Sequence, residues 1–268
     1  MKQSNSCLKY KDHLIRKLTL DALKLSKKKR IVTSISEVDI TEVRKTLKTL
    51  RREKKINLSL YSYALFCIGR AYNDFPRMAA VKGLGNRYYS PGKLSAMLPT
   101  IYEHNGEGLL LPQYIREFNF KSPFEIQNEI EQFKPGKQMD SNELKFFLKF
   151  PQFLRMAYYN TLRYFPVIHD KIMGSTLVVN NMLFTADAWN NGIPFHTSAV
   201  FLGSTSQKVV KIRGEFVERT FLKLTVSADH IVVDGADVAG FMNQVKKNIS
   251  VLYKGLDKHI NDINLNNG

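Results

Sequence analysis

A histidine and an aspartate near the C-terminus have the residue types and spacing of a proton-transfer site. His230 is followed by Asp234 and Gly235 within the stretch SADHIVVDGADVAGFMNQV. A histidine titrates at a pH of about 6.5, so its imidazole can take up and return a proton near neutrality. A nearby carboxylate can fix the tautomer of the imidazole or its loop, and a glycine permits a tight turn. The H-x-x-x-D-G spacing therefore predicts a general base.

The other histidines and the cysteines do not have the spacing of metal ligands, so no metal site is expected. The remaining histidines are His13, His104, His169, His196 and His259. His196 stands in NNGIPFHTSAV, a predicted loop, from which it could reach a neighbouring site, although we expect it at the surface. Cys67 is expected to be buried, and it shares no C-x-x-C motif with Cys7. The absence of P-loop and Rossmann fingerprints argues against nucleotide hydrolysis and hydride transfer.

The composition is that of a folded and strongly basic chain. Its 268 residues are 44% hydrophobic and carry a formal net charge of +16. Such a charge suits an anionic partner, whether nucleic acid, anionic lipid, a phosphorylated cofactor or an acidic carrier protein. No zinc finger or RNP-like motif accompanies the basic clusters, so nucleic acid is not expected. No apolar run approaches the roughly 20 residues that span a bilayer, and a secretory signal is lacking, so we expect a cytoplasmic protein without a transmembrane segment.

Helices and strands alternate through the N-terminal half of the chain. The predicted elements are a helix over 12–28, a strand in RIVTSISEVDI, a helix with Val43, Leu47 and Leu50 on one face, and a buried helix in SLYSYALFCIGRAYNDF. Asn57 or Ser59 would cap the buried helix, and Pro76 would end it. Asn105 and Gly106 predict a hairpin between two strands over 95–117.

The C-terminal half contains an aromatic and basic segment before the strands that lead to His230. Ser122 and Glu125 have capping-box spacing and predict a helix start. Residues 134–171 predict two helices separated near Pro151, packed on the domain, although the segment could also line a substrate channel or touch a membrane. The later strands are STLVVNNMLF, HTSAVFLGS, KVVKIRG and FVERTFLKLTVSAD, with a turn at Gly214 and a last helix from about Ala236. Residues 1–268 are therefore expected to form one α+β domain.

This order of elements resembles the catalytic domain of the 2-oxoacid dehydrogenase acyltransferases, of the dihydrolipoamide acyltransferase type, in the chloramphenicol acetyltransferase superfamily. LTVSADHIVVDGADVAGFMNQV is similar to that family's strand, its D-H-R-x-x-D-G-A turn and its helix. Weaker matches are IRKLTLDALKLSK, SEVDIT, the run Asn73-Asp74-Phe75-Pro76 and SAVFLGS. The resemblance covers about residues 14–253, and residues 134–171 are an insertion. It implies a mixed sheet flanked by helices, and a homotrimer with sites between subunits.

The resemblance also implies the transfer of an acyl group from a thioester to a hydroxyl, thiol or amine of a small-molecule or carrier-bound acceptor. His230 would act as the general base, and Asp234 would brace the turn. The donor would be an acyl-CoA or an acyl carrier protein, with no tightly bound cofactor. Ile231 replaces the family's arginine, and no lipoyl or subunit-binding module precedes the domain, so a stand-alone member is expected.

The group that would stabilise the oxyanion is the main departure from the family pattern. The family's G-T-F-T-x-S-N strand supplies a serine hydroxyl, but GSTLVVNN places Val178 or Val179 there, and neither can donate. Loss of such a donor lowers turnover about 10²- to 10³-fold. The candidate replacements are Asn180, which we favour, Asn181, Ser175, Thr176 or a backbone N–H. Adjacent strand residues face opposite ways, so Asn180 and Val179 cannot both point into the site, and the asparagines could instead simply end the strand.

Two other functions stay open at this point. An antibiotic-modifying acetyltransferase would use the same base with a pocket fitted to a drug. A catalytically silent trimeric scaffold or binding module would account for Val179.

Overall fold

A mixed sheet of six strands organises the chain. The computed structural model describes residues 14–83, 85, 87–104, 107–133, 142–180 and 188–256. The strands are β1 (Ile31–Asp39), β4 (Ala96–His104), β5 (Glu107–Ile115), β6 (Thr176–Asn180), β7 (Ser198–Ile212) and β8 (Glu215–Asp229), in the order β1-β8-β7-β6-β4-β5. The pairs β4/β6 and β6/β7 are parallel, and the other neighbouring pairs are antiparallel. The expected α+β class with a mixed sheet is confirmed.

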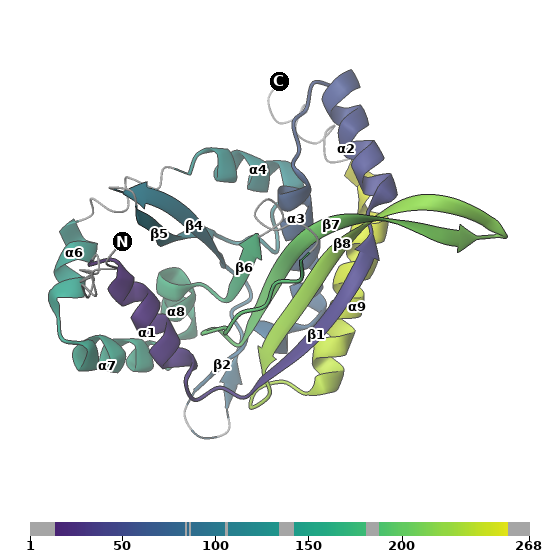
Figure 1. Ribbon diagram of the computed structural model, residues 1–268. Coiled ribbons are helices and arrows are strands. Elements are labelled where there is room, and N and C mark those ends of the chain that lie inside the picture. The colour runs from purple at the N-terminus through teal and green to yellow at the C-terminus, as the bar shows by residue number, and fades with distance from the viewer. Residues whose placement is uncertain are drawn as a thin grey trace, which may run out of the picture.

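Helices cover one face of this sheet and enclose the main core. These helices are α2 (Thr41–Glu53), α3 (Leu60–Asp74), α4 (Pro123–Glu131) and α9 (Gly235–Val251). Figure 1 shows α3 and α9 side by side behind the sheet, and the two helices are in contact. Alternate residues of β8, among them Leu222, Leu224 and Val226, are fully buried beneath them. The half of β8 that leads to His230, residues 222–229, is thereby buried.

The helix signals in the sequence are confirmed where their causes are local. Ser59 caps α3, because its hydroxyl accepts a hydrogen bond from the Ser62 N–H at 3.1 Å. At the start of α4 the Ser122 hydroxyl accepts from the Glu125 N–H at 3.3 Å, and the Glu125 carboxylate accepts from the Ser122 N–H at 2.7 Å. This reciprocal pair satisfies two N–H groups that a helix start leaves unpaired. Cys67 is buried, as expected.

The predicted hairpins are present, with one correction. β4 pairs antiparallel with β5, although Asn105 and Gly106 themselves lie outside the described residues. β7 turns into β8 at Gly214, whose φ of +94° is easily adopted by glycine. HTSAVFLGS and KVVKIRG were expected as separate strands, but they form one strand, β7, with a register shift between Leu202 and Thr205. Gly203 and the polar residues 204–207 lie between the two apolar segments, so the sequence gives no sign that the strands join.

The helical insertion contains three helices in its described part, and the prediction of two was wrong. They are α6 (Asn142–Lys149), α7 (Gln152–Leu162) and α8 (Pro166–Met173). The first break lies at Pro151, as predicted, and Pro166 begins the third helix. Residues 134–141 of the predicted insertion lie outside the described residues. α7 packs against α1 (Arg16–Ser26) beside the β4/β5 end of the sheet (Figure 1).

The connection after α3 brings a short two-stranded sheet to the end of the molecule that carries His230. This connection contains the 3₁₀ helix η1 (Pro76–Ala79), and its two-stranded sheet is formed by β2 (Val81–Lys82) and β3 (Tyr88–Tyr89). A second 3₁₀ helix, η2 (Leu252–Gly255), follows α9.

Candidate active site

The loop that carries His230 begins where β8 ends at Asp229, and Asp229 anchors it. We call residues 229–235 the histidine loop. The Asp229 N–H donates to the Thr197 carbonyl at 2.8 Å. Its carboxylate Oδ1 accepts from the backbone N–H groups of Arg30 at 3.1 Å and Ile231 at 3.2 Å. One carboxylate therefore holds both the chain before β1 and the residue after the histidine.

A buried cation completes this anchor. Lys29 Nζ lies 3.3 Å from Asp229 Oδ2, and both side chains are largely buried. Burial lowers the pKa of the Lys29 ammonium, and the attraction of Asp229 opposes this shift. The sequence analysis missed both residues, although Asp229 directly precedes His230 and lies in the family's D-H motif.

His230 is exposed at the tip of this loop with its ring in a defined orientation. Its backbone N–H donates to the Arg30 carbonyl at 2.6 Å. Its ring Nδ1 lies 3.0 Å from the Val233 carbonyl oxygen. A carbonyl oxygen can only accept, so Nδ1 carries the proton in the neutral ring and Nε2 keeps a free lone pair. Nε2 is therefore the nitrogen that can act as a base toward a molecule outside the loop.

The second half of the loop is fixed by burial and by the start of α9. Val232 and Val233 are buried in the main core. Asp234 is the N-cap residue of α9, and its N–H donates to the Asp237 carboxylate at 3.2 Å. Asp234 thus lies at the helix start, where a carboxylate is stabilised by the helix dipole. Gly235 is the first residue of α9, directly after the turn of residues 230–233, and it does not adopt a left-handed conformation.

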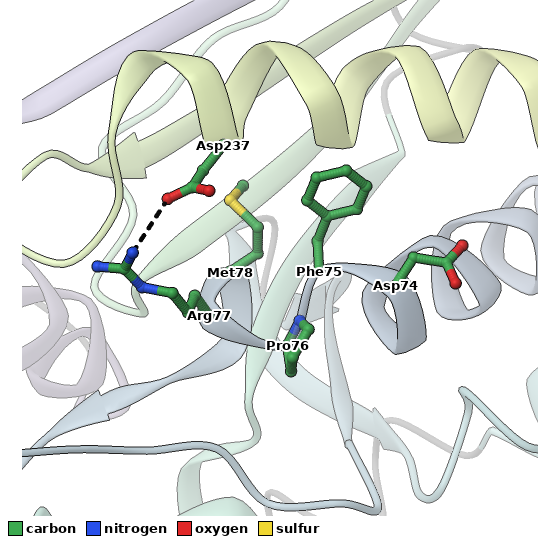
Figure 2. A pocket seen from close by; sticks show the side chains of 6 residues that line it. All are labelled: Asp74, Phe75, Pro76, Arg77, Met78 and Asp237. Atoms are coloured by element: carbon green, nitrogen blue, oxygen red, sulfur yellow. Dashed lines mark ion pairs between the residues drawn. The ribbon is translucent and has the colours of Figure 1, made fainter.

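A shallow cavity of about 290 Å³ borders the histidine loop. It is lined by Asp74, Phe75, Pro76, Arg77, Met78 and Asp237 (Figure 2). Arg77 Nη2 donates to the Val232 carbonyl at 2.9 Å, and its Nη1 lies 3.6 Å from Asp237 Oδ2. The Arg77 side chain therefore joins the cavity wall to both the loop and α9. No sequence signal distinguished Arg77 from the other basic residues.

The hydroxyls of Ser175 and Thr176 are engaged inside the protein. Ser175 donates to the carboxylate of Asp170. Thr176 is fully buried, with its hydroxyl 2.5 Å from the Tyr72 hydroxyl and 3.2 Å from the Ser198 carbonyl. Both side chains thus already have hydrogen-bond partners at the start of β6.

The end of β6 lies far from His230 of the same chain. Val178 points into the main core, and Val179 packs with a smaller cluster on the opposite face, as alternation predicts. Asn180 pairs with Leu202 of β7, which in turn pairs with Leu224 of β8. At about 3.3 Å per residue and about 4.8 Å per strand, Asn180 and His230 are on the order of 20 Å apart. Asn181 lies outside the described residues.

The expectation that His196 lies at the surface was wrong. His196 is 3% exposed, and its Nε2 lies 2.8 Å from the Met173 carbonyl. Its Nδ1 and the Nδ1 of the buried His169 have no hydrogen-bond partner. Burial lowers the pKa of His169 to about 4 and that of His196 to about 3. The loop that precedes β7 is covered by the end of α8, a long-range contact that the local sequence does not encode.

The described residues contain no group of three or more His, Cys, Asp or Glu arranged to hold a metal ion. Within the same residues, no helix has both the length and the apolar character needed to cross a membrane.

Comparisons of sequence confirm the resemblance to the acyltransferase catalytic domain. Residues 171–254, which include the histidine loop, match the family of 2-oxoacid dehydrogenases acyltransferase (catalytic domain). The chain is 24% identical over 231 residues to the dihydrolipoyllysine-residue acetyltransferase component of the pyruvate dehydrogenase complex of Staphylococcus epidermidis. That alignment covers 81% of this chain and 45% of the relative, so the chain spans less than half of the relative's length.

Comparisons of structure define the fold as that of dihydrolipoamide acetyltransferase cores. A probable dihydrolipoamide acetyltransferase from Listeria monocytogenes superposes with a TM-score of 0.71 at 17% identity, over 92% of this chain and 96% of that one. An Azotobacter vinelandii dihydrolipoamide acetyltransferase, studied for the roles of a serine, a histidine and an asparagine in its catalytic mechanism, superposes with a TM-score of 0.69 at 15% identity. It covers 94% of this chain and 95% of that one.

Proposed function

We propose that this chain transfers an acyl group from a thioester donor, an acyl-CoA or an acyl carrier protein, to a hydroxyl, thiol or amine of an acceptor. The orientation of His230 carries the proposal, because its Nδ1 faces the Val233 carbonyl and its Nε2 is left free. A base held in this way contributes about 10²- to 10⁴-fold in rate. The Azotobacter enzyme was studied for the roles of a histidine and an asparagine four positions apart in its catalytic mechanism, which supports a functional role for the positions of His230 and Asp234.

The proton and the acyl group move in opposite directions in this reaction. Nε2 of His230 takes the proton of the acceptor as the acceptor atom attacks the thioester carbonyl. The resulting tetrahedral oxyanion collapses, the carbon–sulfur bond breaks, and the thiolate leaves with the proton that the imidazolium returns. The products are the acylated acceptor and the free thiol of the donor.

We further propose that the site lies between copies of the chain, in a homotrimer. The separation of about 20 Å between Asn180 and His230 supports this arrangement, because an oxyanion donor must lie within about 3 Å of the reacting oxygen. Only the end of β6 of a second copy could bring Asn180 to the histidine loop. To act as donors, Ser175 and Thr176 would have to give up the hydrogen bonds that their hydroxyls make inside the chain.

Thiol release from a panel of acyl-CoA and acyl carrier protein donors, with candidate acceptors, tests the proposal. His230→Ala is expected to lower the rate about 10²- to 10⁴-fold. The matched control is Val251→Ala, an exposed residue at the far end of α9, which should leave the rate unchanged. Mixed assemblies of His230→Ala with Asn180→Ala subunits should regain part of the activity, because some sites combine an intact histidine with an intact asparagine.

A catalytically silent scaffold is the second candidate, because Val179 offers no hydrogen-bond donor. It is favoured if the wild-type protein releases no thiol from any donor and His230→Ala changes nothing. An antibiotic-modifying role differs from the main proposal only in the acceptor, so acetyl-CoA with drug acceptors belongs in the same panel.

A further inference from the structure

The insertion from α6 to α8 exposes large apolar side chains on its outer side. We call this region the aromatic surface, and its main residues are Phe146, Phe153, Leu154, Tyr158, Phe165 and Val167. Phe153 is 67% exposed and Val167 is 74% exposed. Single exposed apolar residues are ordinary, but a contiguous group of this kind usually marks an interaction site.

Packing within the chain does not account for these side chains. The inward face of α7 is already filled by buried residues, including Met156, Tyr159 and Leu162. A surface helix normally turns polar side chains outward, whereas α7 turns Phe153, Leu154 and Tyr158 outward. The helix is therefore apolar on both faces, and only the inner face is covered.

Aromatic side chains of α6 and α7 are in contact with one another. The ring of Phe147 in α6 lies 5.4 Å from the ring of Tyr158 in α7. Phe146 and Phe150 stack edge to face with ring centres 5.2 Å apart. α7 is also in contact with α8, which carries Val167. Figure 1 shows α6 and α7 at the side of the molecule opposite the projecting β7/β8 hairpin.

The charged side chains around this region are basic. Lys149, Arg163 and Lys171 are exposed beside it. Among the described side chains of residues 144–173, Asp170 is the one acidic group, and it accepts hydrogen bonds from buried partners, including Ser95 Oγ at 2.6 Å. The outer side of the insertion therefore combines aromatic side chains with uncancelled positive charge.

We propose that the aromatic surface docks on the anionic face of a lipid bilayer. Phenylalanine, tyrosine and leucine side chains enter the headgroup region, while flanking lysines and arginines meet the anionic headgroups. An acidic carrier protein would satisfy the basic charges but would not require the bulk of exposed Phe153 and Val167. The proposal concerns association with a membrane surface and is independent of acyl transfer.

Vesicle flotation with the full chain tests this docking directly. We expect the protein to float with vesicles of phosphatidylcholine and phosphatidylglycerol, and not with phosphatidylcholine alone. Added salt should weaken the association, because the screening length falls to a few ångströms near 1 M. Lys149→Glu with Lys171→Glu should lower the partition coefficient at least about tenfold, since each basic charge near the surface contributes about fivefold.

Two matched double variants distinguish binding through the aromatic surface from non-specific hydrophobic adsorption to vesicles. Phe153→Ser with Val167→Ser should lower the partition coefficient about a hundredfold, since each buried apolar side chain contributes about tenfold or more. Val209→Ser with Phe216→Ser makes the same kinds of change on the β7/β8 hairpin, at 68% and 75% exposure, and should leave it unchanged. Circular dichroism confirms that each variant is folded.

Three results would overturn the proposal. The first is a wild-type protein that does not float with anionic vesicles, and the second is an equal loss in both double variants. The third is an acidic carrier protein, or a second copy of the chain detected by light scattering, that binds through Phe153 and Val167 when vesicles do not. No acyl donor is present in these assays, so their outcome is separate from that of the thiol-release test.

Discussion

Removing Asp21 from its buried ion pair with Arg155 should destabilise the protein strongly. Arg155 Nε donates to Asp21 Oδ2 at 2.6 Å, and Nη2 donates to Oδ1 at 2.8 Å. The two side chains are 3% and 2% exposed, and they join α7 to α1. Asp21→Ala would remove both carboxylate acceptors from the buried guanidinium and leave it bonded to the Phe150 carbonyl. Loss of one partner of such a pair lowers the free energy of unfolding by about 3–5 kcal/mol.

Replacing both residues separates two effects: the net contribution of the ion pair to stability, and the cost of leaving one buried charge without its partner. The free energy of unfolding of the double variant Asp21→Leu with Arg155→Met should be within about 1 kcal/mol of the wild-type value, or higher, because no buried charge remains. The control is Lys93→Ala, which breaks an exposed pair with Glu117 at 2.8 Å and should change stability by at most about 1 kcal/mol. Urea denaturation measures all four proteins. The reasoning fails if Asp21→Ala loses less than about 1 kcal/mol, or if the double variant is the least stable.

Two further predictions concern the end of the sheet that carries the histidine loop. The free energy of unfolding should fall as pH drops from about 6.5 toward 4, because the unfolded chain takes up protons at His169 and His196 that the folded chain binds only near pH 4 and 3. Urea denaturation at several pH values should show this fall, and the fall should be smaller in His196→Gln. If wild type and His196→Gln lost stability equally with falling pH, the burial of a neutral His196 ring would be contradicted. Asp229→Ala should lower the free energy of unfolding by about 3–5 kcal/mol. This loss should be larger than that of Lys29→Met, because Asp229 also accepts hydrogen bonds from two backbone N–H groups. A larger loss in Lys29→Met would argue that the cation, not the carboxylate, holds the loop.

Features with causes inside one turn or one hairpin could be predicted from the sequence. The capping box of Ser122 and Glu125, the break at Pro151 and the turn at Gly214 each depend on a few neighbouring residues. The last helix was expected from about Ala236, and α9 begins one residue earlier, at Gly235. The H-x-x-x-D-G motif likewise indicated His230 and its chemistry, which remains a proposal.

The tertiary structure decided which atoms surround these residues, because its contacts join segments far apart in the chain. Lys29 and Asp229 meet across 200 positions, and His196 is buried because the end of α8 covers it. The register of three strands set Asn180 far from His230, which a strand pattern alone cannot reveal. The sequence by itself predicted the candidate base and determined the local elements around it. Burial, pairing and the separation of the base from its proposed oxyanion donor followed only from how those elements pack.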